Sequence, residues 1–301
     1  MMYETEIWAG LNRPDLNYEA ADVAVFGIPY DGGVSFRSGA KEAPAAIREI
    51  TYTIAPTTEY FESIADLKVV DLGDIEGEDR ERVFEETAHM VKKLVESGTF
   101  FTMIGGDHST TIAVLQGIDA AVDEPFGIIH IDAHFDLCDA LEGDPLSHGS
   151  TERRALELKH VSGPESLYFL GIRSIEMDEL AFLESHDVNV LSASDFNRMG
   201  VEQVVAAVKA KMSGLNKIYL TLDIDCLDPA YAAGTGTPQF GGLTSRELLT
   251  LLRGLFDLPI IGFDVVEVAP RLDPALTSVF AARKLITECW GHYHRKNGMN
   301  K

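Results

Sequence analysis

The segment FGIIHIDAHFDL, residues 126–137, places ionisable side chains at every second position after an apolar run. These side chains belong to His130, Asp132, His134 and Asp136. In an extended strand, residues two apart point to the same side, so we expect the four side chains to form one polar row. Carboxylates beside a buried apolar run are destabilising unless a cation or a full set of hydrogen bonds compensates them. The spacing therefore predicts a positive charge against this row.

Two other apolar runs end in similar residues. One run leads into GGDHS, which contains His108, and another leads into DIDCLDP, which contains Asp223 and Asp225. Ligands bind beyond the carboxyl ends of the strands in open parallel sheets, so these positions are candidates for a site. A single Asp after a strand usually caps a helix, but His and Asp residues at three strand ends together predict a metal site.

Six side chains are candidate metal ligands: His108, Asp132, His134, Asp136, Asp223 and Asp225. A single octahedral ion that used all six would keep no open position for chemistry. Asp132 and Asp136 would also lie about 13 Å apart in a straight strand, too far for one ion unless the chain bends back. Two ions about 3.5–4 Å apart, bridged by carboxylates, use the same residues, and the four carboxylates balance two divalent charges. We interpret His130 as a structural group beside this centre.

The types of these ligands indicate the metal. Four carboxylates and two imidazoles without a thiolate favour manganese over structural zinc or copper, with cobalt or nickel as substitutes. We therefore expect two Mn²⁺ ions per chain.

The elements that position these residues alternate along the chain. Eight short apolar runs are predicted to be strands: 23–28, 67–72, 100–104, 126–131, 167–172, 188–191, 217–224 and 259–265. Segments with helical periodicity lie between many of them: 80–97, 110–121, 177–186, 201–212, 245–256 and 276–290. The sequence TSRE at Thr244 to Glu247 matches a capping box. This alternation predicts an α/β fold, a three-layer α/β/α sandwich with a mostly parallel sheet of about eight strands.

Composition limits the class of partner. The chain has 301 residues, 46% of them hydrophobic, and shows no repeat or linker, so we expect one domain over 1–301. A net charge of −23 opposes binding to nucleic acid or anionic membranes and favours small cations. Three cysteines without CxxC spacing fit a reducing compartment. With no signal sequence and no apolar run of membrane-spanning length, we expect a cytoplasmic protein.

The motifs GGDHS, DAHFD, SHGS, DIDCLDP and GTGTP together resemble the ureohydrolase family of arginases and agmatinases. The resemblance runs from GIPYDGGVSFRSGAKEAPAAIRE to FDVVEVAP at 263–270 and covers most of the chain. It implies an α/β/α domain whose dinuclear manganese centre hydrolyses a guanidino group to urea and an amine. The implied ligands of one ion are His108, Asp132, Asp136 and Asp223, and those of the other are Asp132, His134, Asp223 and Asp225. Asp132 and Asp223 would then bridge the ions.

The resemblance also implies the remaining roles. Glu267 matches a glutamate that binds the guanidinium, and a carboxylate can accept two parallel N–H bonds from that planar cation. Thr237 in GTGTP is expected to line the same pocket. His148 in SHGS matches a histidine that moves protons, and Asp136 would accept a hydrogen bond from the attacking hydroxide. Phe135 is a departure, because a small hydroxyl residue is usual in DAHTD, and RSGAK replaces the commoner RPGAR.

The loop LCDALEGDPLS, residues 137–147, bears on the substrate. It contains Asp139, Glu142 and Asp144 but no basic residue or asparagine. We expect Asp139 and Glu142 to repel a substrate carboxylate and to favour a terminal amine, which indicates agmatine. The wording EGDPLSHG also resembles bacterial agmatinases. The predicted activity is hydrolysis of agmatine to putrescine and urea by a hydroxide that two manganese ions activate.

Several alternatives remain open. Within the class, the chain is also compatible with a guanidinobutyrase, an arginase or a formimino hydrolase. A deacetylase-like enzyme on a related fold would use one zinc ion, which the paired Asp-x-Asp elements disfavour. A non-catalytic binding protein of the same fold is a further alternative, disfavoured because all six ligand types are present. The resemblance also implies a homo-oligomer, a trimer or a hexamer.

Overall fold

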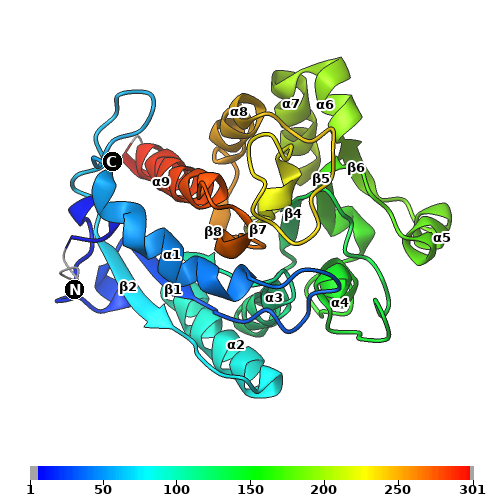
Figure 1. The fold of residues 1–301 in the computed structure, drawn as a ribbon, viewed down its shortest axis with the longest axis horizontal. Helices are drawn as coiled ribbons and strands as arrows, with labels where there is room; N and C mark the ends of the chain where they lie inside the picture. Colours follow the sequence, from blue (N-terminus) through cyan, green and yellow to red (C-terminus); the bar gives the residue numbers. More distant parts are fainter. Residues whose placement is uncertain (1–5, 299–301) are drawn as a thin grey trace.

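A computed structural model describes residues 6–298. The predicted domain over 1–301 therefore extends at both ends beyond the described residues. Within them, the chain forms eight strands and nine α-helices (Figure 1). The strands are β1 Val23–Gly27, β2 Val69–Asp74, β3 Phe100–Ile104, β4 Gly127–Ile131, β5 Leu167–Ile172, β6 Asn189–Ser192, β7 Ile218–Leu222 and β8 Ile260–Val265.

All eight strands belong to one sheet, in the order β2-β1-β3-β8-β7-β4-β5-β6. Every pairing in it is parallel. The carboxyl ends of all strands consequently lie at one edge of the sheet. The four central strands, β3, β8, β7 and β4, are those that lead into the predicted site residues.

The helices cover both faces of the sheet. They are α1 Ala43–Ile50, α2 Arg80–Ser97, α3 Thr110–Ala121, α4 Thr151–Ala155, α5 Met177–Ser185, α6 Ala193–Met199, α7 Val201–Met212, α8 Ser245–Leu255 and α9 Thr277–Gly298. One core packs α1, α6, α7, α8 and α9 on the sheet, and a second packs α2, α3 and α4 on the opposite face. Figure 1 shows α2 and α3 on the side away from α8 and α9. The predicted three-layer sandwich is confirmed.

The cores explain why these segments form strands. Along β1, Val23 and Val25 pack in the first core, whereas Ala24 and Phe26 pack in the second. A strand that is buried on both faces is apolar at every position, and such strands are typical of parallel sheets. All eight strands and six of the helices were predicted within a few residues, apart from the C-terminal helix, which continues to Gly298. The capping box at Thr244 is also confirmed.

Three helices were not predicted: α1, α4 and α6. They have 8, 5 and 7 residues, too few turns for a clear helical period. Among the described residues, no helix is long and apolar enough to cross a membrane.

Candidate metal centre and active site

The chain turns back directly after β4, which corrects the expected polar row. The strand ends at Ile131, so only His130 of the four alternating residues lies in it. Asp136 adopts a left-handed backbone conformation with φ of 55°. The N–H groups of Glu152 and Arg153 donate to its carbonyl oxygen at 2.9 and 3.1 Å and hold this turn. The bend allows Asp132 and Asp136 to approach one atom, which a straight strand would prevent.

That atom is Nδ1 of His108. It lies 3.0 Å from Asp132 Oδ2, 2.9 Å from Asp136 Oδ2 and 3.4 Å from Asp223 Oδ2. The Nδ1 atom and the Oδ2 atoms of Asp132 and Asp136 are buried, and none has a hydrogen-bond partner among the described residues. Buried polar atoms without partners are rare in proteins, so their convergence fits a cation. These are the four residues that the resemblance to ureohydrolases implies as ligands of one ion.

A second group lies beside the first. His134 Nδ1 is 3.4 Å from Asp132 Oδ1 and 3.2 Å from Asp225 Oδ2. Asp132 thus turns one oxygen toward His108 and the other toward His134, as a bridging carboxylate does. Asp223 Oδ1 accepts the backbone N–H of Asp225 at 2.7 Å. His134, Asp132 and Asp225 are close enough to hold one ion together.

The electrostatics of the cluster favour a cation. Burial, together with the charges of Asp225 and Asp132, raises the pKa of Asp223 well above its ordinary value. Burial opposes a charge on His108, but the adjacent carboxylates of Asp132 and Asp136 raise its pKa well above the ordinary range. Neighbouring carboxylates therefore repel one another and attract protons here. Divalent ions would remove that repulsion.

A chain of hydrogen bonds aims His108 at the carboxylates. Its Nε2 lies 2.8 Å from the hydroxyl of Thr221, which donates to Asp264 at 2.8 Å. Asp264 is buried on β8 and also accepts from Tyr219 and Thr111. Because this contact occupies Nε2, the other ring nitrogen is left to face the cluster.

His148 and Glu267 form a buried pair at the side of the cluster. His148 Nδ1 lies 2.9 Å from Glu267 Oε1, which also accepts the backbone N–H of His108 at 2.9 Å. Burial lowers the pKa of His148, but the hydrogen bond to Glu267 outweighs burial and raises it to about 9. Burial favours the neutral form of Glu267, but its bond to His148 lowers its pKa below the ordinary value.

Ser35 completes the surroundings of His148. Its hydroxyl lies 2.8 Å from His148 Nε2, and its backbone N–H lies 3.1 Å from the same atom. The hydroxyl can accept a hydrogen bond from the charged imidazole, and the N–H can donate one to the neutral imidazole. Ser35 therefore accommodates both protonation states, as a proton-transfer group requires.

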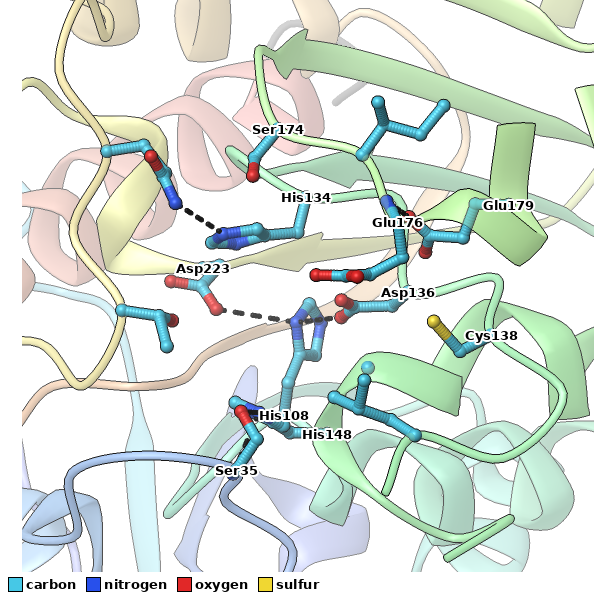
Figure 2. Close-up of a pocket in the computed structure, with 15 residues that line it drawn as sticks. Ser35, His108, His134, Asp136, Cys138, His148, Ser174, Glu176, Glu179 and Asp223 are labelled. Atoms are coloured by element: carbon cyan, nitrogen blue, oxygen red, sulfur yellow. Dashed lines mark hydrogen bonds and ion pairs between the residues drawn. The ribbon is translucent and has the colours of Figure 1, made fainter. Parts of the chain in front are cut away.

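The cluster forms the floor of a cavity (Figure 2). His108, His134, Asp136 and Asp223 line its floor, and His148 and Ser35 lie to one side. Its other lining residues are Cys138, Leu141, Gly149, Ser174, Ile175, Glu176, Glu179, Thr237 and Gln239. Thr237 lines this cavity, with its hydroxyl 3.5 Å from Asp225 Oδ2, and its contact with a substrate stays a prediction.

Three predicted substrate contacts lie outside this lining: Asp139, Glu142 and Glu267, of which Glu267 is buried behind His148. The side chain of Asp139 is 74% exposed and pairs with Arg154 at 3.0 Å. Glu142 is exposed at a left-handed turn. Asp144 of the same loop pairs with Arg80 at 2.5 Å. The loop contributes Cys138 and Leu141 to the cavity wall instead of its acids.

The acidic wall residues that the sequence interpretation missed are Glu176 and Glu179. Figure 2 shows the carboxylate of Glu176 pointing into the cavity. Glu179 accepts the backbone N–H groups of Leu137 and Glu176, both at 2.8 Å, and joins the two walls. Both acids follow β5, at the same edge of the sheet as the other site residues. A search of the residues that follow each predicted strand could therefore have found Glu176 and Glu179.

The fold and the cluster define an α/β protein with a candidate metal centre at the carboxyl edge of its sheet, and comparisons with known proteins identify its family. Residues 21–291 match the arginase family model. The chain therefore belongs to the arginase family. These enzymes depend on a dinuclear metal centre and hydrolyse carbon–nitrogen bonds of guanidino groups.

Individual relatives cover nearly the whole chain. Proclavaminate amidinohydrolase of Streptomyces clavuligerus is 38% identical over 272 residues, covering 86% of this chain and 84% of the relative. The agmatinase of Neisseria meningitidis is 38% identical over 290 residues, covering 93% and 91%. The solved structure of the Streptomyces enzyme superposes with a TM-score of 0.86 at 35% identity and covers 95% of each chain.

Proposed function

We propose that this enzyme hydrolyses agmatine to putrescine and urea. The observation that carries the proposal is the cavity wall, where the acid Glu176 stands with the apolar side chains Leu141 and Ile175, while Glu267 is hydrogen-bonded to His148 of the same lining. Agmatine has the matching chemistry, a guanidinium and an ammonium joined by a methylene chain.

Glu267 would bind the guanidinium. Its Oε1 receives the bonds from His148 and from the backbone of His108, which leaves Oε2 for the substrate. A planar cation beside a carboxylate and above the cluster would have its central carbon turned toward the metal site. This orientation lowers the activation free energy, because the loss of translational and rotational entropy has already occurred on binding.

Glu176 would bind the ammonium. Leu141 and Ile175 offer apolar surface to the methylene chain, and Glu176 points into the same cavity. The role that the sequence interpretation gave to Asp139 and Glu142 therefore passes to Glu176 in our proposal. Among the residues that line the cavity, none is Lys or Arg. A substrate carboxylate would have no cation to pair with there.

The proposed metal ligands are those of the two groups described above. His108, Asp132, Asp136 and Asp223 would hold one manganese ion, and Asp132, His134, Asp223 and Asp225 the other. When bound, such a pair supplies a hydroxide nucleophile at neutral pH. The convergence of partnerless buried atoms at His108 supports this assignment.

The chain's own residues would manage the protons. The Asp136 carboxylate would accept a hydrogen bond from the attacking water and orient it. His148 would give a proton to the leaving amine and recover it through solvent, with Ser35 stabilising either form. We further propose that the enzyme is cytoplasmic. We also propose that it forms a trimer or a hexamer, and sedimentation analysis would test this oligomeric state.

A second candidate is an amidinohydrolase with another guanidino substrate, which the similarity to the Streptomyces enzyme favours. The test is urea release from agmatine, arginine and guanidinobutyrate, with formamide release from formiminoglutamate, at equal manganese and pH. We expect agmatine to be preferred by at least about tenfold in kcat/KM, about 1.4 kcal/mol. A preference for arginine or guanidinobutyrate would refute the assignment to agmatine. Absence of urea from all three guanidino compounds would refute the assignment to agmatine, and urea release from a different guanidino compound would then establish the second candidate.

A further inference from the structure

A third histidine, His130, lies directly beneath the metal cluster. It is fully buried on β4, and its ring is parallel to that of His108, with centroids 5.1 Å apart and an interplanar angle of 2°. Its Nε2 lies 2.9 Å from the carbonyl oxygen of His134 and 3.2 Å from Asp132 Oδ2. His130 therefore contacts three of the six predicted metal ligands.

The geometry makes His130 a hydrogen-bond donor. A carbonyl oxygen can only accept, so the Nε2 atom that faces His134 must carry a hydrogen. A nitrogen that carries a hydrogen has no lone pair for a metal ion. The other ring nitrogen, Nδ1, lies 3.0 Å from Glu152 Oε1 and is also occupied. His130 is close enough to His108 and Asp132 to share a metal ion with them. Because both of its ring nitrogens are occupied, we infer that it supports the ligands through hydrogen bonds instead of binding metal itself.

Glu152 holds the turn at two points. Its backbone N–H donates to the Asp136 carbonyl at 2.9 Å, and its side chain contacts His130. The side chain is fully buried, and its Oε2 has no hydrogen-bond partner among the described residues. A buried pair of this kind generally contributes little to stability, because desolvation offsets the attraction. Stability alone is therefore a poor explanation for a glutamate here.

The aromatic surroundings keep His130 in place. Phe169 meets the edges of both His130 and Phe135, with centroid distances of 5.2 Å in each case. Phe135 is the residue that departs from the usual DAHTD motif, and it lies between His134 and Asp136 with its side chain buried in the core. The imidazole is therefore fixed by packing on one side and by Glu152 on another.

We propose that the His130–Glu152 pair is a positioning element that holds Asp132, His134 and the Asp136 turn in the arrangement that binds metal. The inference rests on the proposed function, because it takes those three residues as ligands. Breaking the pair should loosen the His134 side of the centre most, since His134 is the more exposed of the two histidine ligands, at 25% against 1% for His108.

The test compares Glu152→Gln with the wild-type protein and with Glu288→Gln. Glu288 is a matched control, because it is also buried, has a partnerless Oε2 and lies on α9 away from the cluster. Metal-free samples are titrated with Mn²⁺ and followed by electron paramagnetic resonance, and kcat and KM are measured on the urea-releasing substrate. We expect Glu152→Gln to weaken one of two Mn²⁺ sites and to lower kcat by about 10- to 100-fold, with little change in KM.

The outcomes are distinguishable. Glu152→Gln with wild-type manganese binding and kcat would overturn the inference and leave the proposed function intact. Equal losses of metal in Glu288→Gln would also overturn it, because any buried charge would then suffice. A wild-type protein that binds no Mn²⁺ would overturn the proposed ligands and the inference with them. If Glu152→Gln does not fold, Glu152→Met replaces the carboxylate with an apolar group, and a folded protein with wild-type manganese affinity would refute the proposal.

Discussion

His148 Nδ1 lies 2.9 Å from Glu267 Oε1. The residue proposed to move protons and the residue proposed to bind the guanidinium are therefore one hydrogen-bonded pair. Their backbones come from segments 119 residues apart, after β4 and β8. Binding of the substrate at Glu267 should therefore change the proton affinity of His148, because both compete for one carboxylate.

The protonation of His148 can be measured in the metal-free protein. Its pKa is raised from 6.5 to about 9 by Glu267, against the effect of burial. The stabilisation from this pair is therefore complete below pH 6.5 and is lost as the pH rises through about 9. We expect NMR titration of the imidazole to show the raised pKa, and Glu267→Gln to bring it down toward 6.5. An unshifted pKa in the wild-type protein would contradict the pairing.

Removing the imidazole should affect turnover more than metal binding. We expect His148→Ala to lower kcat by about 10²- to 10⁴-fold, the usual contribution of a general acid or base. Its manganese content should stay at the wild-type level, and added imidazole should restore part of the rate. A folded His148→Ala protein that has lost its metal would place His148 among the ligands instead.

Asp223 is expected to bridge the two metal ions. Asp223→Asn should lower activity by orders of magnitude and weaken metal retention, because an amide cannot neutralise the cations. Metal analysis of the wild-type protein after reconstitution should give about two manganese ions per chain. Saturation at one ion would rule out the dinuclear assignment, and unchanged metal content in Asp223→Asn would remove this residue from the centre.

Glu176 and Asp139 separate two explanations of substrate preference. If Glu176 binds the ammonium, Glu176→Gln should lower kcat/KM for agmatine about tenfold, the size of one charge-assisted hydrogen bond. Asp139→Asn is the matched control, because Asp139 is exposed, pairs with Arg154 and lies outside the cavity lining. The reverse result, with loss only in Asp139→Asn, would favour the loop acids.

Phe135 is expected to stabilise the fold under the metal-binding turn. It is buried and meets Phe169 edge to face at a centroid distance of 5.2 Å. Phe135→Ala should lower the free energy of unfolding by about 3–5 kcal/mol, the usual cost of a cavity of this size. Urea denaturation measures this free energy. A decrease of less than about 1 kcal/mol would show that neighbouring side chains fill the space left by Phe135.

The strands were predictable because parallel strands buried on both faces are apolar without interruption. The candidate ligands could be located in the sequence because they follow those strands directly, and their assignment to metal ions stays a prediction. The turn at Asp136 was not predictable, because its backbone is held by Glu152, which lies 16 positions later in the sequence. The orientation of the acids in the loop 137–147 was also not predictable, because it depends on partners that are distant in the sequence. Asp144 faces Arg80, a residue 64 positions away that no local pattern connects to it.

Glu176 was overlooked because it belongs to no recognised motif and lies between the predicted strand 167–172 and the predicted helix 177–186. Glu176 occupies the N-cap position of α5, so local structure and the cavity wall share one residue. A position before a helix can be inferred from the sequence. The position of Glu176 in the cavity wall depends on the path of the chain after β5, which the sequence does not show.

The order of the strands has a consequence for how the protein assembles. β8 is the last strand of the chain, yet it lies in the middle of the sheet between β3 and β7. Before it enters, β2-β1-β3 and β7-β4-β5-β6 have no shared strand, and His108 belongs to one set while Asp132 and Asp223 belong to the other. Such distant pairings form late and slowly. Bound metal would join the two sets across the strand that arrives last, so a newly made chain cannot complete its metal site until β8 is synthesised and in place.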